Sequence, residues 1–201
     1  TMRPLTIISV TMSDMEDPVL ANAVRKLMLA YHNELSTTYN CNLGAFQAFE
    51  DELDNLPGKY AFATRGALFL AMLPDPDIEP ESDEEDEYDK GYYVLVGPNS
   101  LLQGKAATRP INPKLLVGIV GLRPVGEDAS VASACEVKRM FVSKEGRGKG
   151  VGLALSLAVV NAARRIGGYQ IVLLDSLKRL VGAVKIYEKL GFKECEKYCD
   201  C

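Results

Sequence analysis

The sequence predicts an α/β fold of the α+β type, with a mixed, mostly antiparallel central sheet of about six to seven strands flanked by about four helices. Two observations support this. Apolar runs of strand length are interspersed with amphipathic runs of helix length, and Pro or Gly separates many of them. There is also no internal repeat, and 201 residues suit a single domain over the whole chain, 1–201.

The N-terminal half begins with a predicted strand over Leu5 to Val10. Asp17-Pro18 supplies an N-cap and an N1 proline for a first helix. Its apolar stripe has helical spacing: Leu20, Val24, Leu27, Met28, Tyr31 and Leu35. A second helix is marked by Phe46, Phe49, Leu53 and Leu56. The next strand runs from Gly66 to Leu73, where Pro74 ends it.

Residues 74–91 are predicted to be an acidic, disordered or solvated insertion, because they offer little to bury. They hold ten acidic side chains and only one basic one, Lys90. The stretch from Asp75 to Asp89 alone carries −10, so the remainder carries +6 although the chain as a whole carries −4. A mildly basic body suits a ligand with several phosphate charges.

In the C-terminal half we predict a short strand over Tyr92 to Val96, followed by a loop that ends near Pro113. Further strands are predicted over 115–122 and 134–142, and a buried strand over 169–174. A helix over 150–165 ends at Gly167-Gly168, a C-cap pair. The last helix carries Leu180, Val184, Tyr187 and Leu190 on one face and stops at Gly191. The predicted order closes with a strand after Phe192, for which few residues remain.

The most informative stretch is Arg147-Gly-Lys-Gly-Val-Gly152, between a predicted strand and a predicted helix. Backbone N–H groups of such a turn and the positive end of the helix dipole together attract a phosphate. Gly148, Gly150 and Gly152 carry no Cβ, so a pyrophosphate can approach the main chain closely. The stretch is neither a Walker loop, because no Lys-Ser/Thr pair follows, nor the dinucleotide spacing G-x-G-x-x-G.

Read as R-x-x-G-x-G, this stretch resembles the acetyl-coenzyme A pyrophosphate loop of the GNAT family, the GCN5-related N-acetyltransferases. Upstream, Cys135 to Val142 is similar to the family's fourth strand. Downstream, Leu174 to Leu177 and Ala183 to Phe192 are similar to its fifth strand and the following helix. The resemblance covers roughly residues 115 to 195, and the first half of the chain matches more loosely.

The resemblance implies the GNAT fold, in which the fourth and fifth strands splay apart to admit the pantetheine arm of acetyl-coenzyme A. It implies acetyl-coenzyme A as co-substrate, with no metal. Pantetheine is expected along Met140, Phe141 and Val142, and the adenosine end near Ser176 and Leu177. The pyrophosphate is expected on Arg147, Gly148, Lys149, Gly150, Val151 and Gly152.

Two catalytic residues are predicted. Tyr187 stands where many family members place a tyrosine near the coenzyme sulfur, and a neutral phenol can protonate the leaving thiolate; an amphipathic core tyrosine is the alternative. Glu136 is the candidate base for the acceptor amine, because residues 136, 138, 140 and 142 of a strand share one face. Its alternative is an orienting carboxylate paired with Lys138 or Arg139.

The function expected is acetyl transfer to a primary amine of a small or amino-acid-like acceptor, by direct attack in a ternary complex. A protein or peptide lysine or N-terminal acetyltransferase and a non-catalytic acyl-coenzyme A module remain alternatives. The start carries no secretory signal, no apolar run approaches membrane-spanning length, and the five cysteines are scattered. We therefore expect a cytoplasmic protein without metal, nucleic-acid or membrane partners, and leave open a homodimer. His32 is expected to be a partly buried, non-catalytic imidazole.

Overall fold

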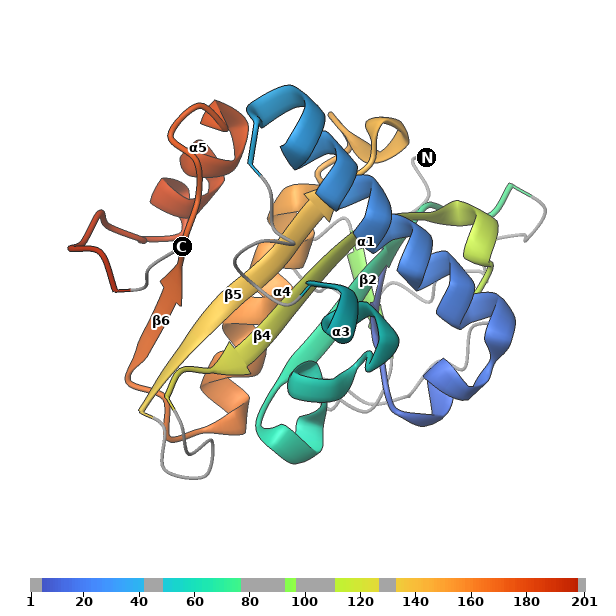
Figure 1. The fold of residues 1–201 in the computed structure, drawn as a ribbon, viewed down its shortest axis with the longest axis horizontal. Coiled ribbons are helices and arrows are strands. Elements are labelled where there is room, and N and C mark those ends of the chain that lie inside the picture. Colours follow the sequence, from blue (N-terminus) through green and yellow to red (C-terminus); the bar gives the residue numbers. More distant parts are fainter. Residues whose placement is uncertain (1–4, 42–48, 77–92, 97–110, 127–132, 199–201) are drawn as a thin grey trace, which may run out of the picture.

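The computed structural model describes residues 5–41, 49–76, 93–96, 111–126 and 133–198. Within them, one six-stranded sheet has the order β3-β1-β2-β4-β5-β6 (Figure 1). Its strands are β1 (Leu5–Ser9), β2 (Ala67–Met72), β3 (Tyr93–Val96), β4 (Leu116–Pro124), β5 (Ala134–Val142) and β6 (Ile171–Leu174).

Antiparallel pairing joins β1 to β2, β2 to β4 and β4 to β5. Parallel pairing joins β1 to β3 at one end of the sheet and β5 to β6 at the other. The predicted mixed, mostly antiparallel sheet is therefore confirmed, and its strands agree with the sequence to within a few residues. The acidic insertion lies largely outside the described residues.

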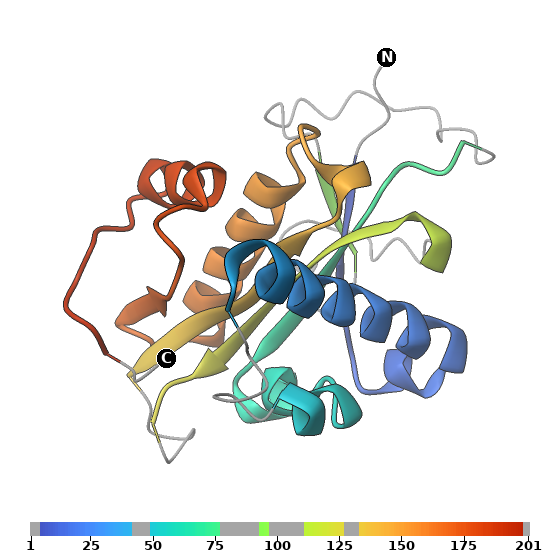
Figure 2. The same cartoon turned by 45° about the horizontal axis from the view of Figure 1, so that its top comes forward.

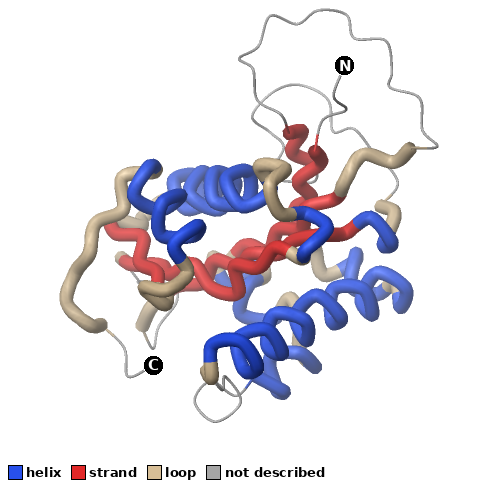
Figure 3. Tube along the Cα trace, turned by 90° about the horizontal axis from the view of Figure 1, so that it is seen from above, coloured by secondary structure: helices blue, strands red, loops and turns tan. Residues whose placement is uncertain are grey.

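The α-helices of the described residues are α1 (Pro18–Tyr39), α3 (Phe49–Asp54), α4 (Val151–Ile166) and α5 (Val181–Lys189). Helices α1 and α3 cover one face of the sheet, and α4 covers the other (Figures 1 and 3). The predicted cap of α1 is present, because Asp17 Oδ1 accepts a hydrogen bond of 2.8 Å from the Val19 amide.

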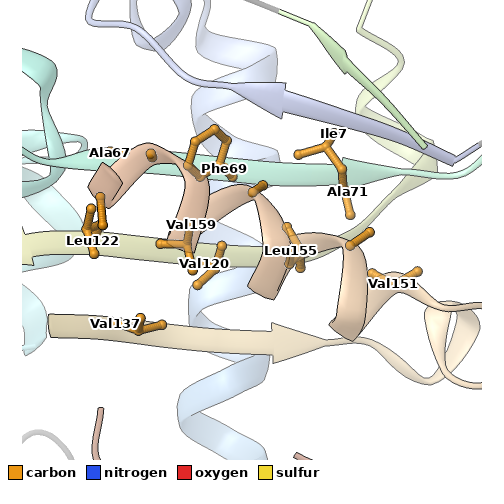
Figure 4. Close-up of a cluster of buried hydrophobic side chains, with 14 of the residues drawn as sticks. Ile7, Ala67, Phe69, Ala71, Val120, Leu122, Val137, Val151, Leu155 and Val159 are labelled. Carbon is orange, nitrogen blue, oxygen red and sulfur yellow. The ribbon is translucent and has the colours of Figure 1, made fainter. Parts of the chain in front are cut away.

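The core on the α4 face joins the helix to four strands. Val151, Leu155 and Val159 recur at i, i+4 and i+8 and pack against β1, β2, β4 and β5 (Figure 4). All three side chains are essentially inaccessible to solvent. This packing fixes the N-terminal end of α4, and with it the glycine-rich turn that precedes the helix.

In the core on the α1 face, the ring of Tyr60 packs closely against β4. Tyr60 is 1% exposed, and a Cβ placed on Gly121 would come within 2.6 Å of its ring. A glycine in β4 is therefore required for the ring to lie against the strand. Val24 and Met28 of α1 are fully buried in the same core.

Two predictions at the C-terminal side are wrong. Residues 169–174 were expected to be a buried strand, but Ile171 of β6 is 55% exposed. Strand β6 pairs only with β5 among the described strands, so its other side is not covered by a neighbour. The predicted closing strand is also absent from residues 192–198.

A β-bulge in β5 overturns a third prediction. Phe141 pairs with Ile119 and Lys138 with Gly121, so Arg139 and Met140 together oppose Val120. Arg139 takes a positive φ of 58° there. The bulge shifts the alternation by one residue. Met140 and Val142 consequently pack toward α4 with Val137, and do not share a face with Glu136.

Candidate active site

A cavity opens where two neighbouring strands diverge. Strands β5 and β6 are paired from Ala134–Ile171 to Val137–Leu174, and beyond that point β5 continues without β6. Beside the end of β5 lies a cavity of about 690 Å³, lined by residues 140–142 of β5 and by residues of the segment 179–187, which follows β6. The expected splayed pair of central strands is therefore present.

Four segments far apart in the sequence wall this cavity. One of them is α5, which lies next to α4 (Figure 2). The end of β5 and the glycine-rich turn form its floor and one end. Helix α1 forms the opposite wall through Tyr31, Glu34, Leu35 and Tyr39. The wall from α5 and the turn before it includes Arg179, Gly182, Ile186 and Tyr187.

The glycine-rich turn has the form of an anion site. Gly148 and Gly150 have φ values of 74° and 77°, and nothing lies within 4 Å of where a Cβ would stand on either. Gly150 is the N-cap of α4, and no side chain caps that helix end. The first amides of a 16-residue helix thus lack a side-chain acceptor and face the cavity, as a phosphate requires.

Gly152 plays a different part in this turn. A Cβ on Gly152 would stand 3.2 Å from Cδ1 of Ile186, which is tighter than an ordinary contact. A small residue at this position therefore allows α5 to approach the first turn of α4. The two helices close the cavity between them.

Arg147 spans the mouth of the cavity. Its Nε donates to the Val142 carbonyl at 3.1 Å, and its Nη2 donates to both carboxylate oxygens of Glu34 at 2.6 Å. Glu34 lies on α1, 113 positions away in sequence. The guanidinium is half-exposed, so a phosphate arriving at the turn can reach it.

Tyr187 lines the same cavity from α5. Its ring packs edge-on against Phe192 with centroids 5.9 Å apart. Burial, with a smaller contribution from Tyr31, raises the pKa of Tyr187 to about 12. The phenol therefore keeps its proton at neutral pH and can donate it to a stronger base formed in the cavity.

Glu136 does not line this cavity. Its side chain is 4% exposed, and Arg123 Nε donates to it at 2.5 Å while Lys138 Nζ lies 3.6 Å away. The Tyr198 hydroxyl is 3.4 Å from its other oxygen. Glu136 belongs to the half of β5 that pairs with β6, so it is separated along the strand from Met140 and the cavity.

The remaining predicted ligand residues divide into two groups. Met140, Phe141, Val142, Arg147, Gly148, Gly150, Val151 and Gly152 all line the cavity. Lys149 is exposed and does not line it. Ser176 lines a second cavity of about 500 Å³ beside β6, and Leu177 packs against the core on the α1 face.

The sequence did not single out Tyr31 and Glu34 in the wall that α1 contributes. Tyr31 reads as one member of an apolar stripe, and Glu34 reads as a surface carboxylate. The available signal is their i, i+3 spacing, which places both on one face of the helix. His32, the next residue, stacks on Phe49 with centroids 4.9 Å apart and lies outside the cavity lining, in keeping with a structural imidazole.

The part of the chain that the structure describes lacks two further features. No cluster of three or more His, Cys, Asp or Glu side chains there is arranged to hold a metal ion. No helix there is both long and apolar enough to cross a membrane.

Comparison with known proteins gives a domain match over the C-terminal segments that line this cavity. The model of the acetyltransferase (GNAT) domain matches residues 111–194. This stretch contains β4, β5, α4, β6 and α5, together with the glycine-rich turn. The first 110 residues, including the α1 wall, lie outside the match.

Individual proteins that are similar to this chain are also named N-acetyltransferases. An uncharacterized N-acetyltransferase of Schizosaccharomyces pombe is 34% identical over 82 residues, which is 41% of this chain and 47% of that protein. The match thus spans about half of that relative's length. An uncharacterized N-acetyltransferase of Dictyostelium discoideum is 25% identical over 170 residues, which is 77% of this chain and 78% of that protein. The crystal structure of an acetyltransferase from Streptococcus agalactiae superposes with a TM-score of 0.58 at 14% identity, covering 98% of this chain and 87% of that one, and shows a shared fold.

Proposed function

We propose that this chain transfers acetyl from acetyl-coenzyme A to a primary amine of a small or amino-acid-like acceptor, because its residues 111–194 match the acetyltransferase (GNAT) domain. One observation carries the proposal. An uncapped helix N-terminus on a glycine-rich turn and a protonated tyrosine line a single cavity between splayed strands. A phosphate-bearing thioester needs both groups at its two ends.

The turn and the end of β5 fit acetyl-coenzyme A in different ways. Backbone amides over residues 147–152 would bind the pyrophosphate, with the charge of Arg147 beside them. Residues 140–142 lie in the part of β5 that no longer pairs with β6. Their main chain can therefore hydrogen-bond the amides of pantetheine, as a neighbouring strand would. Acetyl-coenzyme A would supply the activated acetyl group, and these protein residues would orient it.

Acetyl transfer requires three further events. The acceptor amine must lose a proton, the carbonyl oxygen must be stabilised while it carries negative charge, and the thiolate must be protonated as the C–S bond breaks. Tyr187 is the proposed acid. A pKa of about 12 keeps it protonated across the working range, and the leaving thiolate takes its proton.

The role of Glu136 as base stays a prediction. Its carboxylate is engaged by Arg123 and Lys138, so proton removal from the amine would pass through intervening water. These same contacts suit the alternative role, in which Glu136 orients neighbouring cations. The two roles differ in their effect on the pH–rate profile, as described in the Discussion.

The test is release of free thiol from acetyl-coenzyme A in the presence of polyamines, amino sugars, amino acids or peptides. Turnover with a small amine supports the proposal. Turnover only with peptides would instead assign this chain to the enzymes that acetylate proteins. Coenzyme A binding without turnover of any amine would instead identify an acyl-coenzyme A binding module.

A further inference from the structure

A buried ionic cluster lies behind the cavity wall, on the α1 face of the sheet. Glu52 of α3 accepts hydrogen bonds from Arg139 Nε at 2.6 Å, from Arg139 Nη2 at 3.0 Å and from the Tyr60 hydroxyl at 2.9 Å. Lys59 Nζ lies 2.5 Å from its second oxygen. The side chains of Glu52 and Arg139 are only 3% and 2% exposed.

This cluster is built at a conformational cost. Arg139 occupies the bulge of β5 with a φ of 58°, a region that a long side chain rarely adopts. Removing two charges from water is also unfavourable, and packed apolar side chains would fill the same space at no such cost. A strained residue in a buried ion pair at the edge of a cavity indicates a positional role.

Tyr31 connects the cluster to the cavity. Its ring lies 6.0 Å from that of Phe141. Burial raises the pKa of Tyr31, and the nearby Arg139 guanidinium opposes that rise. A guanidinium can only donate hydrogen bonds, so next to a phenol it approaches the oxygen and leaves the phenol O–H to donate elsewhere. Tyr31 and Tyr187 line the same cavity, and Tyr31 makes a smaller contribution than burial to the raised pKa of Tyr187.

We propose that Tyr31 is a further catalytic residue, which donates a hydrogen bond to the thioester carbonyl oxygen, and that Glu52 and Arg139 are the positioning residues that hold it. The inference rests on the proposed acetyl transfer. The amine nitrogen bonds to the carbonyl carbon, the oxygen carries negative charge until the C–S bond breaks, and Tyr187 protonates the thiolate. Tyr31 keeps its own proton throughout. A donor already aimed at the developing charge needs no reorganisation during the reaction.

The first step of the test separates this inference from the proposed function. Wild-type protein is titrated with coenzyme A by calorimetry and assayed for thiol release with the amine panel. If neither binding nor turnover is found, the proposed function fails. If turnover is found, the variants below test the inference alone.

The decisive variant is Tyr31→Phe, which removes one hydroxyl and keeps the ring against Phe141. We expect kcat to fall by about 10²-fold, the effect of losing one donor to an oxyanion, while the Kd of coenzyme A stays within about two-fold. A kcat within two-fold of wild type overturns the proposal. The matched control is Tyr169→Phe, because Tyr169 is another half-buried tyrosine beside an arginine, Arg65, and lies outside this cavity. It should leave kcat unchanged.

The positioning role is tested by a double-mutant cycle. Glu52→Gln should lower kcat, and combining it with Tyr31→Phe should cause no further loss, because both act through one hydroxyl. Independent, multiplying losses would contradict the link. If Glu52→Gln does not fold, Arg139→Lys replaces it: a single ammonium keeps the charge beside Glu52 but cannot reach both Glu52 and Tyr31. Its kcat should then fall as in Tyr31→Phe, and an unchanged kcat would remove Arg139 from the proposal.

Discussion

Arg147 and Glu34 face each other across the mouth of the cavity, and both oxygens of the Glu34 carboxylate accept hydrogen bonds of 2.6 Å from Arg147 Nη2. The pair joins α1 to the glycine-rich turn. It also places a negative charge next to the only described arginine of that turn, where the proposed pyrophosphate would bind. A carboxylate and a phosphate compete for the same guanidinium.

Glu34→Gln should therefore tighten coenzyme A binding. The amide keeps the size of the side chain but no longer neutralises Arg147, so the Kd should fall a few-fold. Calorimetry at low and at moderate salt measures the change, which should shrink as salt rises. Weaker binding by Glu34→Gln would mean that the carboxylate orients Arg147 for the ligand. Exposed Glu50→Gln on α3 is the control.

Gly150→Val should weaken coenzyme A binding strongly, by ten-fold to thousands-fold. A side chain at this φ strains the turn and covers the first amides of α4. Gly126→Val is the control for strain alone, since Gly126 also has a positive φ, of 119°, and follows the far end of β4. Calorimetry with both folded variants makes the comparison. Equal, small effects on binding would argue against a pyrophosphate site at this turn.

Tyr187→Phe should lower kcat by about 10²–10⁴-fold while coenzyme A binding is retained. Because the pKa of Tyr187 is raised to about 12, the phenol stays protonated below that value, and the ratio of wild-type to variant rate should be constant from pH 7 to 10. Steady-state kinetics over this range provide the measurement. A ratio of one at every pH would exclude an acid role, whereas a ratio that falls toward one only at high pH would mean an acid whose pKa is lower than about 12.

Glu136→Gln distinguishes the two roles of Glu136. If the carboxylate is the base, the loss in rate should be greatest at neutral pH and shrink as the acceptor amine deprotonates unaided. If it orients Arg123 and Lys138, the rate should fall by the same factor at every pH, or not at all, and thermal stability should drop. A pH–rate profile with the wild-type shape removes Glu136 as the base.

Acid should destabilise the fold through Glu52. Burial raises the pKa of this carboxyl, but the hydrogen bonds and charges of Arg139 and Lys59 outweigh burial and lower the pKa from 4.5 to about 2. A lowered pKa contributes stability that is complete above 4.5 and is lost as the pH falls toward 2. About 2 kcal/mol of this contribution should disappear between pH 6 and pH 3.

Urea unfolding at these two pH values checks the expectation. The gap in free energy of unfolding between wild type and Glu52→Gln should narrow by that amount at pH 3. Glu50→Gln, on the exposed side of the same helix, should show no such narrowing. A gap independent of pH would mean that Glu52 keeps an ordinary pKa in the folded protein.

Much of the cavity could be predicted because it is local in sequence. The strand β5, the turn after it and the start of α4 are continuous, so glycine spacing and alternation identify them together. The exposure of β6 could not be read in this way, since an apolar run of four residues is the same for a buried and an edge strand.

The bulge at Arg139 could not be predicted from the sequence either. Lys138-Arg139-Met140 contains no Gly, Pro or Asn to mark it, and the ion pair that compensates for it joins residues 87 positions apart. Contacts between distant segments also explain why Tyr31, Glu34 and Glu52 were missed. Each is ordinary in its own helix and becomes informative only beside β5 or the turn.

The bulge makes the alternation of β5 matter more than the identity of several of its side chains. Up to Lys138, the odd-numbered side chains of β5 face α4. From Met140 onward, the even-numbered side chains face α4. Closing the bulge without shortening β5 would restore a regular ladder. Met140 and Val142 would then exchange sides with Phe141, even though no side chain near the glycine-rich turn had been altered. A change that closes the bulge at constant strand length should therefore be far more damaging than a conservative substitution at a neighbouring position.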